Sequence, residues 1–362
     1  SNLIGRIEPS RPITKWTMQI SYLHGPVIDR VSGGAARMFF YVPWDGLVDG
    51  GLKAFSGAYA WSAQASVPGS TTVKSLGHGI VNAYCGRIPF RSEDCDGRPA
   101  LLLISRQRGL THLQAFWHEG TLSGQLRGRS RHGYDGDWPE CSRYPRVACV
   151  RTFVPFGDFN GDRFGDLLAK YSDGTMRAFF GHGEAQFDGA KSVRVGRSWS
   201  NITMVAAPGD LNADGRPDLV ARDRAGRLWL YRGTGHSRFM KRVLMSGGWN
   251  KYDHLVGAGN LTGTGATAET GPGSILAVTK SGAMWRFTGN GHAGFTKAVR
   301  VSGAWSRYNA IVGIGDLNHD ARNDLVARDR SGNLWFFAGT GRGGFAGRKL
   351  LNANFGHWRA MY

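Results

Sequence analysis

Three short loops of the sequence carry oxygen-bearing side chains at a spacing that suits a hard metal cation. In the clearest of them, Asp210-x-Asn212-x-Asp214-Gly215-x-x-Asp218, carboxylate or amide oxygens stand at the first, third, fifth and ninth positions. Calcium takes six to eight oxygen ligands, and a tight loop with alternating side chains can wrap it. Carboxylates packed this closely would repel one another without a cation. The predicted calcium ligands are, loop by loop, Asp158, Asn160, Asp162 and Asp166; Asp210, Asn212, Asp214 and Asp218; and Asp316, Asn318, Asp320 and Asp324.

These loops belong to an internal repeat with a period of about 50 residues. Trp199, Trp249 and Trp305 stand at one fixed distance before the first loop positions at 210, 260 and 316. A turn that begins with glycine and ends with phenylalanine follows each loop, at 181–187, 233–239, 289–295 and 339–345. Such regular spacing indicates one structural unit that recurs along the chain.

Short apolar runs separated by turns fill each repeat. Met204–Ala207 leads into a loop, Asp218–Ala221 leaves it, Leu228–Tyr231 follows a turn at Gly226, and a fourth run starts at Phe239. Four strands of this length form an antiparallel blade, and one blade cannot bury both of its faces. Several blades must therefore stack around an axis, which predicts an all-β protein with the β-propeller fold.

The N-terminal part of the chain carries the same unit in eroded form. The apolar runs 38–42, 100–104 and 166–169 are followed by three related strands at 52–55, 113–116 and 176–179. We therefore predict a single domain of six blades over 1–362, and seven blades stay open because 358–362 repeats the opening of a unit and could close the ring. The predicted blades are 16–76, 77–146, 147–198, 199–248, 249–304 and 305–357.

The loops and their surroundings resemble FG-GAP or VCBS repeats, as in integrin-type propellers and secreted bacterial lectins. The resemblance covers about 150–357 and is clearest in the third, fourth and sixth units. It implies a propeller with about three structural calcium ions in hairpin loops on its rim. The backbone carbonyl of Arg216 can supply a further ligand.

Some positions depart from this family pattern. Arg163 and Ala321 stand where the family prefers the glycine that Gly215 supplies, so weaker calcium binding is expected in their loops. Asn260-x-Thr262-x-Thr264 has lost the carboxylates, and we predict no ion there.

Four cysteines indicate disulfides in an exported protein. The pairing Cys85–Cys95 with Cys141–Cys149 is the local one and the one we favour, although four cysteines allow three pairings. Neither pair has the tight spacing of a zinc site. The chain opens without a signal-peptide pattern, and we expect a secreted bacterial protein, with cell-wall association as an option, whose export signal has been removed.

The formal net charge of +18 favours anionic partners. The basic residues are scattered and form no nucleic-acid-binding motif, so a glycan is the expected partner rather than a nucleic acid. No apolar run approaches the roughly 18 residues that a membrane span needs.

Several repeated positions are candidates for ligand contact. The tryptophans that open the units could stack on sugar rings if they are partly exposed, whereas Trp229, Trp285 and Trp335, in the middle of strands, are expected to pack between blades. Polar or cationic residues recur two positions after each opening tryptophan, and histidines recur in the glycine turns. The predicted ligand-binding residues are Trp199, Trp249, Lys251, Trp305, Arg307, His236 and His292.

Three functions are compatible with these features. We favour a calcium-stabilised, lectin-like protein that binds cell-wall or acidic polysaccharide glycans, since repeated pockets would add avidity. The first alternative is a polysaccharide-degrading enzyme, a lyase or a glycoside hydrolase, although no linear catalytic motif is present. Its candidate residues are His78, His118, His236, His292, Tyr252 and Arg307. The second alternative is a propeller that binds a protein partner.

Overall fold

A computed structural model gives the architecture of residues 2–22, 27–44, 47–48, 52–53, 57–83, 101–107, 110–116, 138–139, 149–181, 192–263, 271–301 and 303–362. These residues form strands, turns and two short 3₁₀ turns, with no α-helix among them. No helix in this described part is long and apolar enough to cross a membrane. The chain divides into two compact units, of which unit 1 is built on Ser1–Arg87 and unit 2 on Arg98–Asn318 and Arg322–Tyr362.

Six four-stranded antiparallel sheets make up most of the structure, as the predicted fold class requires. Five of them lie in unit 2, and four of these run in chain order from the first strand to the fourth. The first of these four sheets consists of β12 (Val150–Phe156), β13 (Asp166–Tyr171), β14 (Met176–Phe179) and β15 (Val193–Gly196), and the second of β16 (Ile202–Gly209), β17 (Asp218–Asp223), β18 (Leu228–Tyr231) and β19 (Val243–Ser246). The third consists of β20 (Tyr252–Gly257), β21 (Ser274–Thr279), β22 (Met284–Thr288) and β23 (Val299–Val301). The fourth consists of β24 (Tyr308–Gly315), β25 (Asp324–Asp329), β26 (Leu334–Phe337) and β27 (Lys349–Asn352).

The fifth sheet of unit 2 joins the two ends of this unit. Its order is β11-β10-β9-β28, so that the C-terminal strand β28 (Ala360–Met361) pairs with β9 (Leu101–Gln107). The other members are β10 (Leu110–Phe116) and β11 (Trp138–Pro139). The C-terminal segment therefore closes the ring inside an existing blade, and it makes no additional blade of its own in the described structure.

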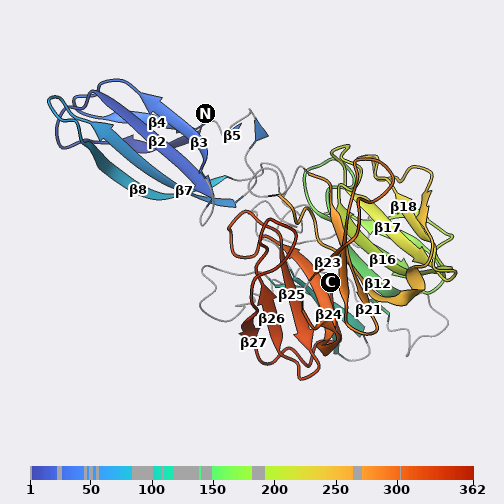
Figure 1. The fold of residues 1–362 in the computed structure, drawn as a ribbon. Helices are drawn as coiled ribbons and strands as arrows, with labels where there is room; N and C mark the ends of the chain where they lie inside the picture. The colour runs from blue at the N-terminus through green and yellow to red at the C-terminus, as the bar shows by residue number, and fades with distance from the viewer. Residues whose placement is uncertain are drawn as a thin grey trace. The chain divides into compact units, whose positions relative to one another are not determined.

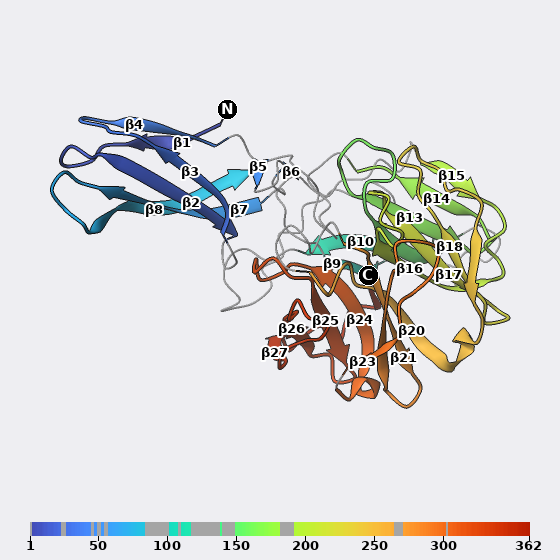
Figure 2. The ribbon, with the colours of Figure 1, turned by 45° about the horizontal axis from the view of Figure 1, so that its top comes forward.

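Apolar side chains hold these five sheets together as a ring, which Figures 1 and 2 show arranged around the C-terminus. Each of five buried clusters joins one sheet to the next, and the fifth joins the last sheet to the first. Pairs that represent the five contacts are Leu102 and Phe153, Phe156 and Leu219, Leu230 and Ile275, Leu276 and Leu325, and Val326 and Leu103. The ring leaves its innermost strands β12, β16, β20, β24 and β28 facing a common axis.

Unit 1 is organised differently from the predicted domain and its first two blades. Its four-stranded sheet has the order β3-β2-β7-β8, in which β2 (Lys15–Tyr22) pairs along its whole length with β7 (Gly57–Ser66). The other strands of this sheet are β3 (Val27–Gly33) and β8 (Val73–Ala83). The expected single domain over 1–362 is therefore wrong, and so are the first blade at 16–76 and the start of the second at 77.

The pairing of the apolar run 38–42 explains the error. It contributes to β4 (Phe40–Trp44), which pairs with β1 (Asn2–Ile7) and not with the run at 52–55. The short strand β6 (Leu52–Lys53) pairs instead with β5 (Leu47–Val48). Aromatic contacts stabilise this arrangement, because Trp16 stacks on Phe40 with ring centroids 4.6 Å apart. An apolar strand pattern alone does not specify which strand becomes its neighbour.

The predicted disulfides fall mostly outside the described residues. Cys85, Cys95 and Cys141 lie outside them, as does most of the insertion at 121–149. Cys149 is buried and takes part in a disulfide. The pairing stays a prediction.

Candidate functional site

The first residues of the predicted calcium loops form tight turns closed by hydrogen bonds from backbone to carboxylate. The Asp210 carboxylate accepts from the backbone N–H groups of Asp214 at 3.1 Å and Gly215 at 2.6 Å. The amide of Asn212 donates to the Asp214 carboxylate at 2.9 Å. The loop at 158–166 repeats this pattern, with Asp158 accepting from three backbone N–H groups. Both loops thus gather their predicted ligands in one turn.

The third predicted loop connects β24 to β25. Asp316, Asn318 and Asp320 are half-buried there, and all three take part in polar or electrostatic interactions. The ninth residue of this loop, Asp324, is fully buried.

The ninth position has a role that the sequence analysis missed. The carboxylates of Asp166, Asp218 and Asp324 are fully buried at the start of the second strand of their blades. One oxygen accepts from the backbone of the second loop residue, and the other accepts from the glycine that opens the later turn. The distances to Gly181, Gly233 and Gly339 are 3.0, 3.1 and 2.8 Å. Each aspartate therefore joins its loop to the glycine turn, which explains why the two motifs recur together.

The pKa values of these buried carboxylates are relevant to the predicted binding of calcium. The pKa of Asp166 is raised to about 8 and that of Asp218 to about 7. Burial is the largest cause, the neighbouring loop carboxylates act in the same direction, and the backbone hydrogen bonds oppose both. A cation beside these carboxylates would favour their charged form, and carboxylate oxygens are ligands that calcium accepts. However, the part of the chain that the structure describes holds no preformed group of three or more His, Cys, Asp or Glu side chains around a metal position. The calcium ions stay a prediction.

Left-handed backbone conformations occur in all three predicted calcium loops. Gly215 has φ 83°, a left-handed conformation that glycine adopts freely. Arg163 and Ala321 adopt similar values, 74° and 64°, although they carry Cβ atoms. The left-handed region disfavours such residues. The loop that contains Gly215 also holds one, because Ala213 has φ 61°, so each loop carries at least one residue in this conformation. The weaker calcium binding expected at Arg163 and Ala321 stays a prediction.

The opening tryptophans do not offer the exposed faces that the sequence analysis expected. Trp199, Trp249 and Trp305 are only 4, 4 and 2% exposed. They pack in the clusters between blades, where Trp199 stacks on Tyr231 with ring centroids 4.6 Å apart. The expected partial exposure of these rings is therefore wrong, because neighbouring aromatic side chains already cover them. Their part in ligand binding stays a prediction.

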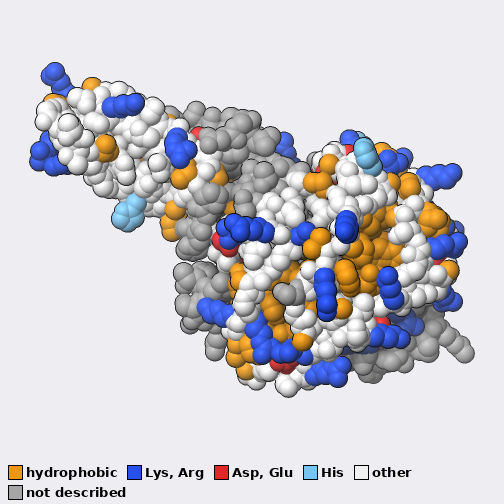
Figure 3. All heavy atoms as spheres, viewed as in Figure 1, with side chains coloured by type: hydrophobic (Ala, Val, Ile, Leu, Met, Phe, Trp, Pro, Cys, Tyr) orange, Lys and Arg blue, Asp and Glu red, His pale blue; other side chains and the backbone are white. Residues whose placement is uncertain are grey.

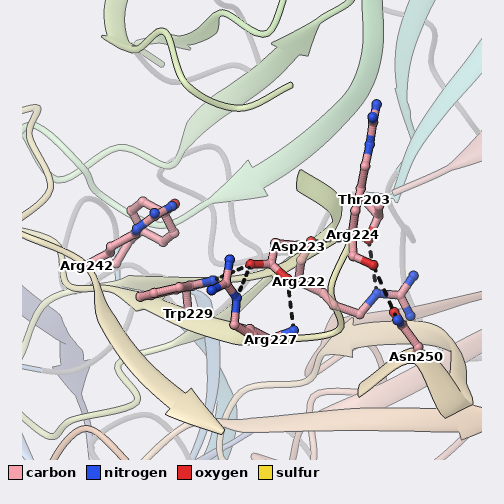
Figure 4. Close-up of polar contacts among 9 residues, drawn as sticks. Thr203, Arg222, Asp223, Arg224, Arg227, Trp229, Arg242 and Asn250 are labelled. Atoms are coloured by element: carbon pink, nitrogen blue, oxygen red, sulfur yellow. Dashed lines mark hydrogen bonds and ion pairs between the residues drawn. The ribbon is translucent and has the colours of Figure 1, made fainter. Parts of the chain in front are cut away.

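The mid-strand tryptophans are more accessible than predicted. Trp229 and Trp335 are half-buried, and a guanidinium lies over each ring, Arg242 at 4.2 Å and Arg348 at 4.0 Å from the ring centroid. The indole N–H of Trp229 donates to the Asp223 carboxylate at 3.0 Å (Figure 4). Trp285 and Trp335 still pack against the clusters between blades, as predicted, but they are less buried than the opening tryptophans.

Arginines at the end of the second blade strand connect neighbouring blades, a function that no sequence motif revealed. Arg222 is 9% exposed and donates to the backbone carbonyls of Trp249 at 3.2 Å and Tyr252 at 2.6 Å. Arg328 donates in the same manner to the carbonyls of Phe355 and Trp358. We call these residues latch residues, because each binds the segment that opens the next blade. Lys170 holds the equivalent position and donates to the carbonyl of Ile202.

A hollow of about 330 Å³ lies beside the opening of the last blade. It brings Trp305 and Arg307, two predicted ligand residues, together with Arg348. The guanidinium of Arg348 donates to the hydroxyl of Tyr308 at 3.1 Å. The remaining lining consists of small residues and aromatic side chains, Gly303, Ala304, Phe337, Phe345, Ala346 and Gly347. We call this hollow the rim groove; it combines apolar ring surface with two cationic side chains.

The other predicted ligand and catalytic residues are not gathered at this groove. His236 and His292 are exposed at the tips of two glycine turns, and neither lines the rim groove. Lys251 is exposed and lies 5.2 Å from the ring centroid of Tyr252, which is itself buried. His78 belongs to β8 of unit 1, and His118 lies outside the described residues.

One family model matches part of the chain. Residues 158–221 match the FG-GAP-like repeat, which confirms the resemblance for the stretch that contains the Asp158 and Asp210 loops of two consecutive units. No curated protein matches the sequence.

Several solved structures have a similar arrangement of strands. A lectin of Agrocybe aegerita, which recognises non-reducing terminal N-acetylglucosamine, shows 16% identity over 96% of this chain and 93% of its own, with a TM-score of 0.41. The BP39L lectin of Burkholderia pseudomallei shows 13% identity over 96% of this chain and all of its own, with a TM-score of 0.40. Human WBSCR16 shows 11% identity over 91% and 90%, with a TM-score of 0.32. The fold assignment rests on the strand pairing described above rather than on these similarities.

Proposed function

We propose that this chain is a secreted, calcium-stabilised β-propeller that binds carbohydrate through the rim groove. The observation that supports it most directly is the meeting of Arg307 and Arg348 in one hollow with Phe345, whose ring is half-buried rather than covered. Aromatic carbon surface packs against the apolar face of a sugar ring. Two guanidinium groups favour a sugar that carries a carboxylate, sulfate or phosphate. The ligand that fits is therefore an acidic glycan.

The charge of the chain favours the same class of ligand. The net charge is +18, and Figure 3 shows Lys and Arg side chains spread over the visible face, with few Asp or Glu side chains among them. A positive field of this kind raises the association rate of polyanions without selecting one. Selectivity would then come from the groove, where Arg307 and Arg348 have fixed positions.

Calcium has a structural part in this proposal. An ion in each of the three loops would neutralise the carboxylates that raise one another's pKa, and its binding free energy would add to the free energy of unfolding. The loops and the rim groove share no lining residue among those described, so calcium would act on stability rather than on the sugar contact.

Binding to an array of neutral and acidic glycans tests the proposed function. We expect acidic glycans to bind, and Arg307→Ala and Arg348→Ala to weaken binding in a folded protein. Arg197→Ala, at an exposed position outside the groove, is the matched control. Each bound polymer is also tested for new chain ends, because product formation would identify an enzyme. Binding that survives both groove substitutions would contradict the proposal.

A further inference from the structure

The innermost strands of the ring share a bulge at which the side chain differs from blade to blade. Strand pairing skips one residue at the start of β12, β16, β20 and β24. The skipped residues are Arg151, Thr203, Asp253 and Asn309, and all four side chains are exposed. Bulges re-aim side chains and occur often beside functional sites. One end of the axis is therefore lined by different chemistry from each blade.

In two blades the bulge residue serves the latch arginine of the same blade. The Nε of Arg222 donates to Thr203 Oγ1 at 3.1 Å, and the Nε of Arg328 donates to Asn309 Oδ1 at 3.0 Å. The pair consists in both cases of one cation and one neutral oxygen acceptor. This acceptor binds the Nε–H of the guanidinium, which makes no hydrogen bond to the described carbonyls of the next blade.

The blade of β12 replaces this pair by two cations. Lys170 occupies the latch position, and Arg151 occupies the bulge where the other blades place the acceptor oxygen. Within the described residues, the Arg151 side chain makes no hydrogen bond or ion pair, and it is not among the residues with further contacts. The acceptor that the repeat provides elsewhere is missing, and a second positive charge stands beside the first.

These two cations line a hollow of about 380 Å³ on the axis of the ring. Its walls come from all four bulged strands or their neighbours and from the C-terminal residues, and its apolar lining includes Met204, Val256 and Ile311. Ligand sites in proteins commonly have volumes of about 300–1,000 Å³. Asp253 on β20 lines the same hollow and repels negative charge, so an anion is expected beside Arg151 and Lys170.

We infer that this axial hollow is a binding site for an oxyanion, carried by an acid about the size of a sugar acid, and that Arg151 and Lys170 bind it. An oxygen of the anion takes the place that Thr203 Oγ1 and Asn309 Oδ1 hold in the other blades. The apolar lining accepts the carbon framework of the ligand. The inference is independent of the rim groove, because the two hollows have no lining residue in common.

The electrostatics of Lys170 agree with this geometry. Burial lowers the pKa of Lys170, and the positive charges of Arg224 and Arg151 lower it further. A bound anion would relieve this repulsion and restore the pKa of the ammonium group.

Isothermal titration of the full chain with glucuronate, sulfate and phosphate at constant ionic strength tests the site, with glucose as the uncharged control. The informative variant is Arg151→Thr, which installs the residue of the equivalent bulge on β16. The double variant Arg151→Thr/Lys170→Arg rebuilds the complete Thr203–Arg222 pair and so preserves the contact between blades. Arg197→Thr makes the same change of charge at an exposed position and is the matched control.

The wild type and Arg197→Thr should bind at least one of the anions but not glucose. Arg151→Thr and the double variant should lose at least about tenfold in affinity, the usual effect of removing a charge-assisted hydrogen bond. Binding of glucuronate alone would identify a carboxylate ligand, and binding of sulfate or phosphate a tetrahedral one; both support the site. Failure of the wild type to bind any anion, or equal affinity in Arg151→Thr and Arg197→Thr, would overturn it.

Discussion

The Asp223 carboxylate is the centre of a polar contact whose removal has a calculable cost. Its side chain is 2% exposed and accepts from the Trp229 indole at 3.0 Å, from the Arg227 guanidinium at 2.8 Å and from the Arg227 backbone at 2.9 Å (Figure 4). The equivalent residue on β21 is Thr279, whose hydroxyl accepts the corresponding backbone contact from Ala283 at 3.1 Å and also contacts Ser281 and the Ala283 carbonyl. Asp223→Thr therefore copies a residue that the repeat already tolerates.

The expected loss follows from the two contacts that threonine cannot replace. Leaving the half-buried indole N–H of Trp229 without its partner costs about 2 kcal/mol. The Arg227 side chain is 49% exposed, so its screened ion pair contributes less than about 1 kcal/mol. Asp223→Thr should thus lower the free energy of unfolding by about 2–3 kcal/mol at pH 7.

The pH dependence of this loss is a second readout. Burial alone would raise the pKa of Asp223, but the hydrogen bonds from Trp229 and Arg227 outweigh it and hold the pKa at about 2. Because the folded-state pKa lies below the unfolded value, the carboxylate stabilises the fold above about pH 4 and loses this effect as the pH falls toward 2. The difference between wild type and variant should therefore shrink at low pH.

Urea unfolding of wild type and Asp223→Thr at pH 7 and pH 3 measures both effects. Asp173→Thr, which changes the charge equally at an exposed side chain, is the control and should cost less than about 1 kcal/mol. Equal losses in the two variants, or a loss that does not depend on pH, would refute the reasoning.

Three further predictions concern the ring and its loops. Arg328→Met should lower the melting temperature and increase proteolysis at the C-terminus, because β28 loses the latch that binds Trp358. Gly233→Ala should cost about 3 kcal/mol, since a Cβ would overlap the carbonyl oxygen of Pro217, whereas Gly347→Ala meets no atom within 4 Å and should be nearly neutral in urea unfolding. Chelation of calcium should lower the melting temperature more at pH 8 than at pH 5. The raised pKa values of Asp166 and Asp218 let protons replace the cation at low pH, and an equal effect at both pH values would contradict this.

The features of the repeat that were predicted from fixed residue spacings agree with the structure. The loops, the glycine turns and the four strands of the blades after Val150 follow from residues at fixed separations, and the structure confirms these strands. The physical reason is that the strands of a blade pair with neighbours that are close in sequence, so the strand pattern can be recognised within one repeat. The strand pairing of unit 1 could not be predicted in this way, because β2 pairs with β7, which lies far from it in the sequence.

Burial could not be predicted from residue type. Both sets of tryptophans are large and amphipathic, and only the contacts between blades decide which set is covered. Trp305 is covered by Phe337 with ring centroids 4.9 Å apart, whereas Trp335 faces the guanidinium of Arg348. The latch residues were missed for a related reason, since the carbonyls that they bind belong to the next repeat.

Comparison of equivalent positions within one ring separates structural residues from candidate ligand residues. The ninth loop aspartate is the same in three blades and makes the same backbone contacts in each, which is the behaviour of a residue that each blade needs in order to fold. The bulge residue is different in every blade, although the backbone there is the same. Thr203 and Asn309 accept a hydrogen bond from the latch arginine of their blade, whereas Arg151 makes no such contact within the described residues. The positive charge of Arg151 is therefore best explained by something outside the chain, and an anion on the axis is the partner that its surroundings can accept.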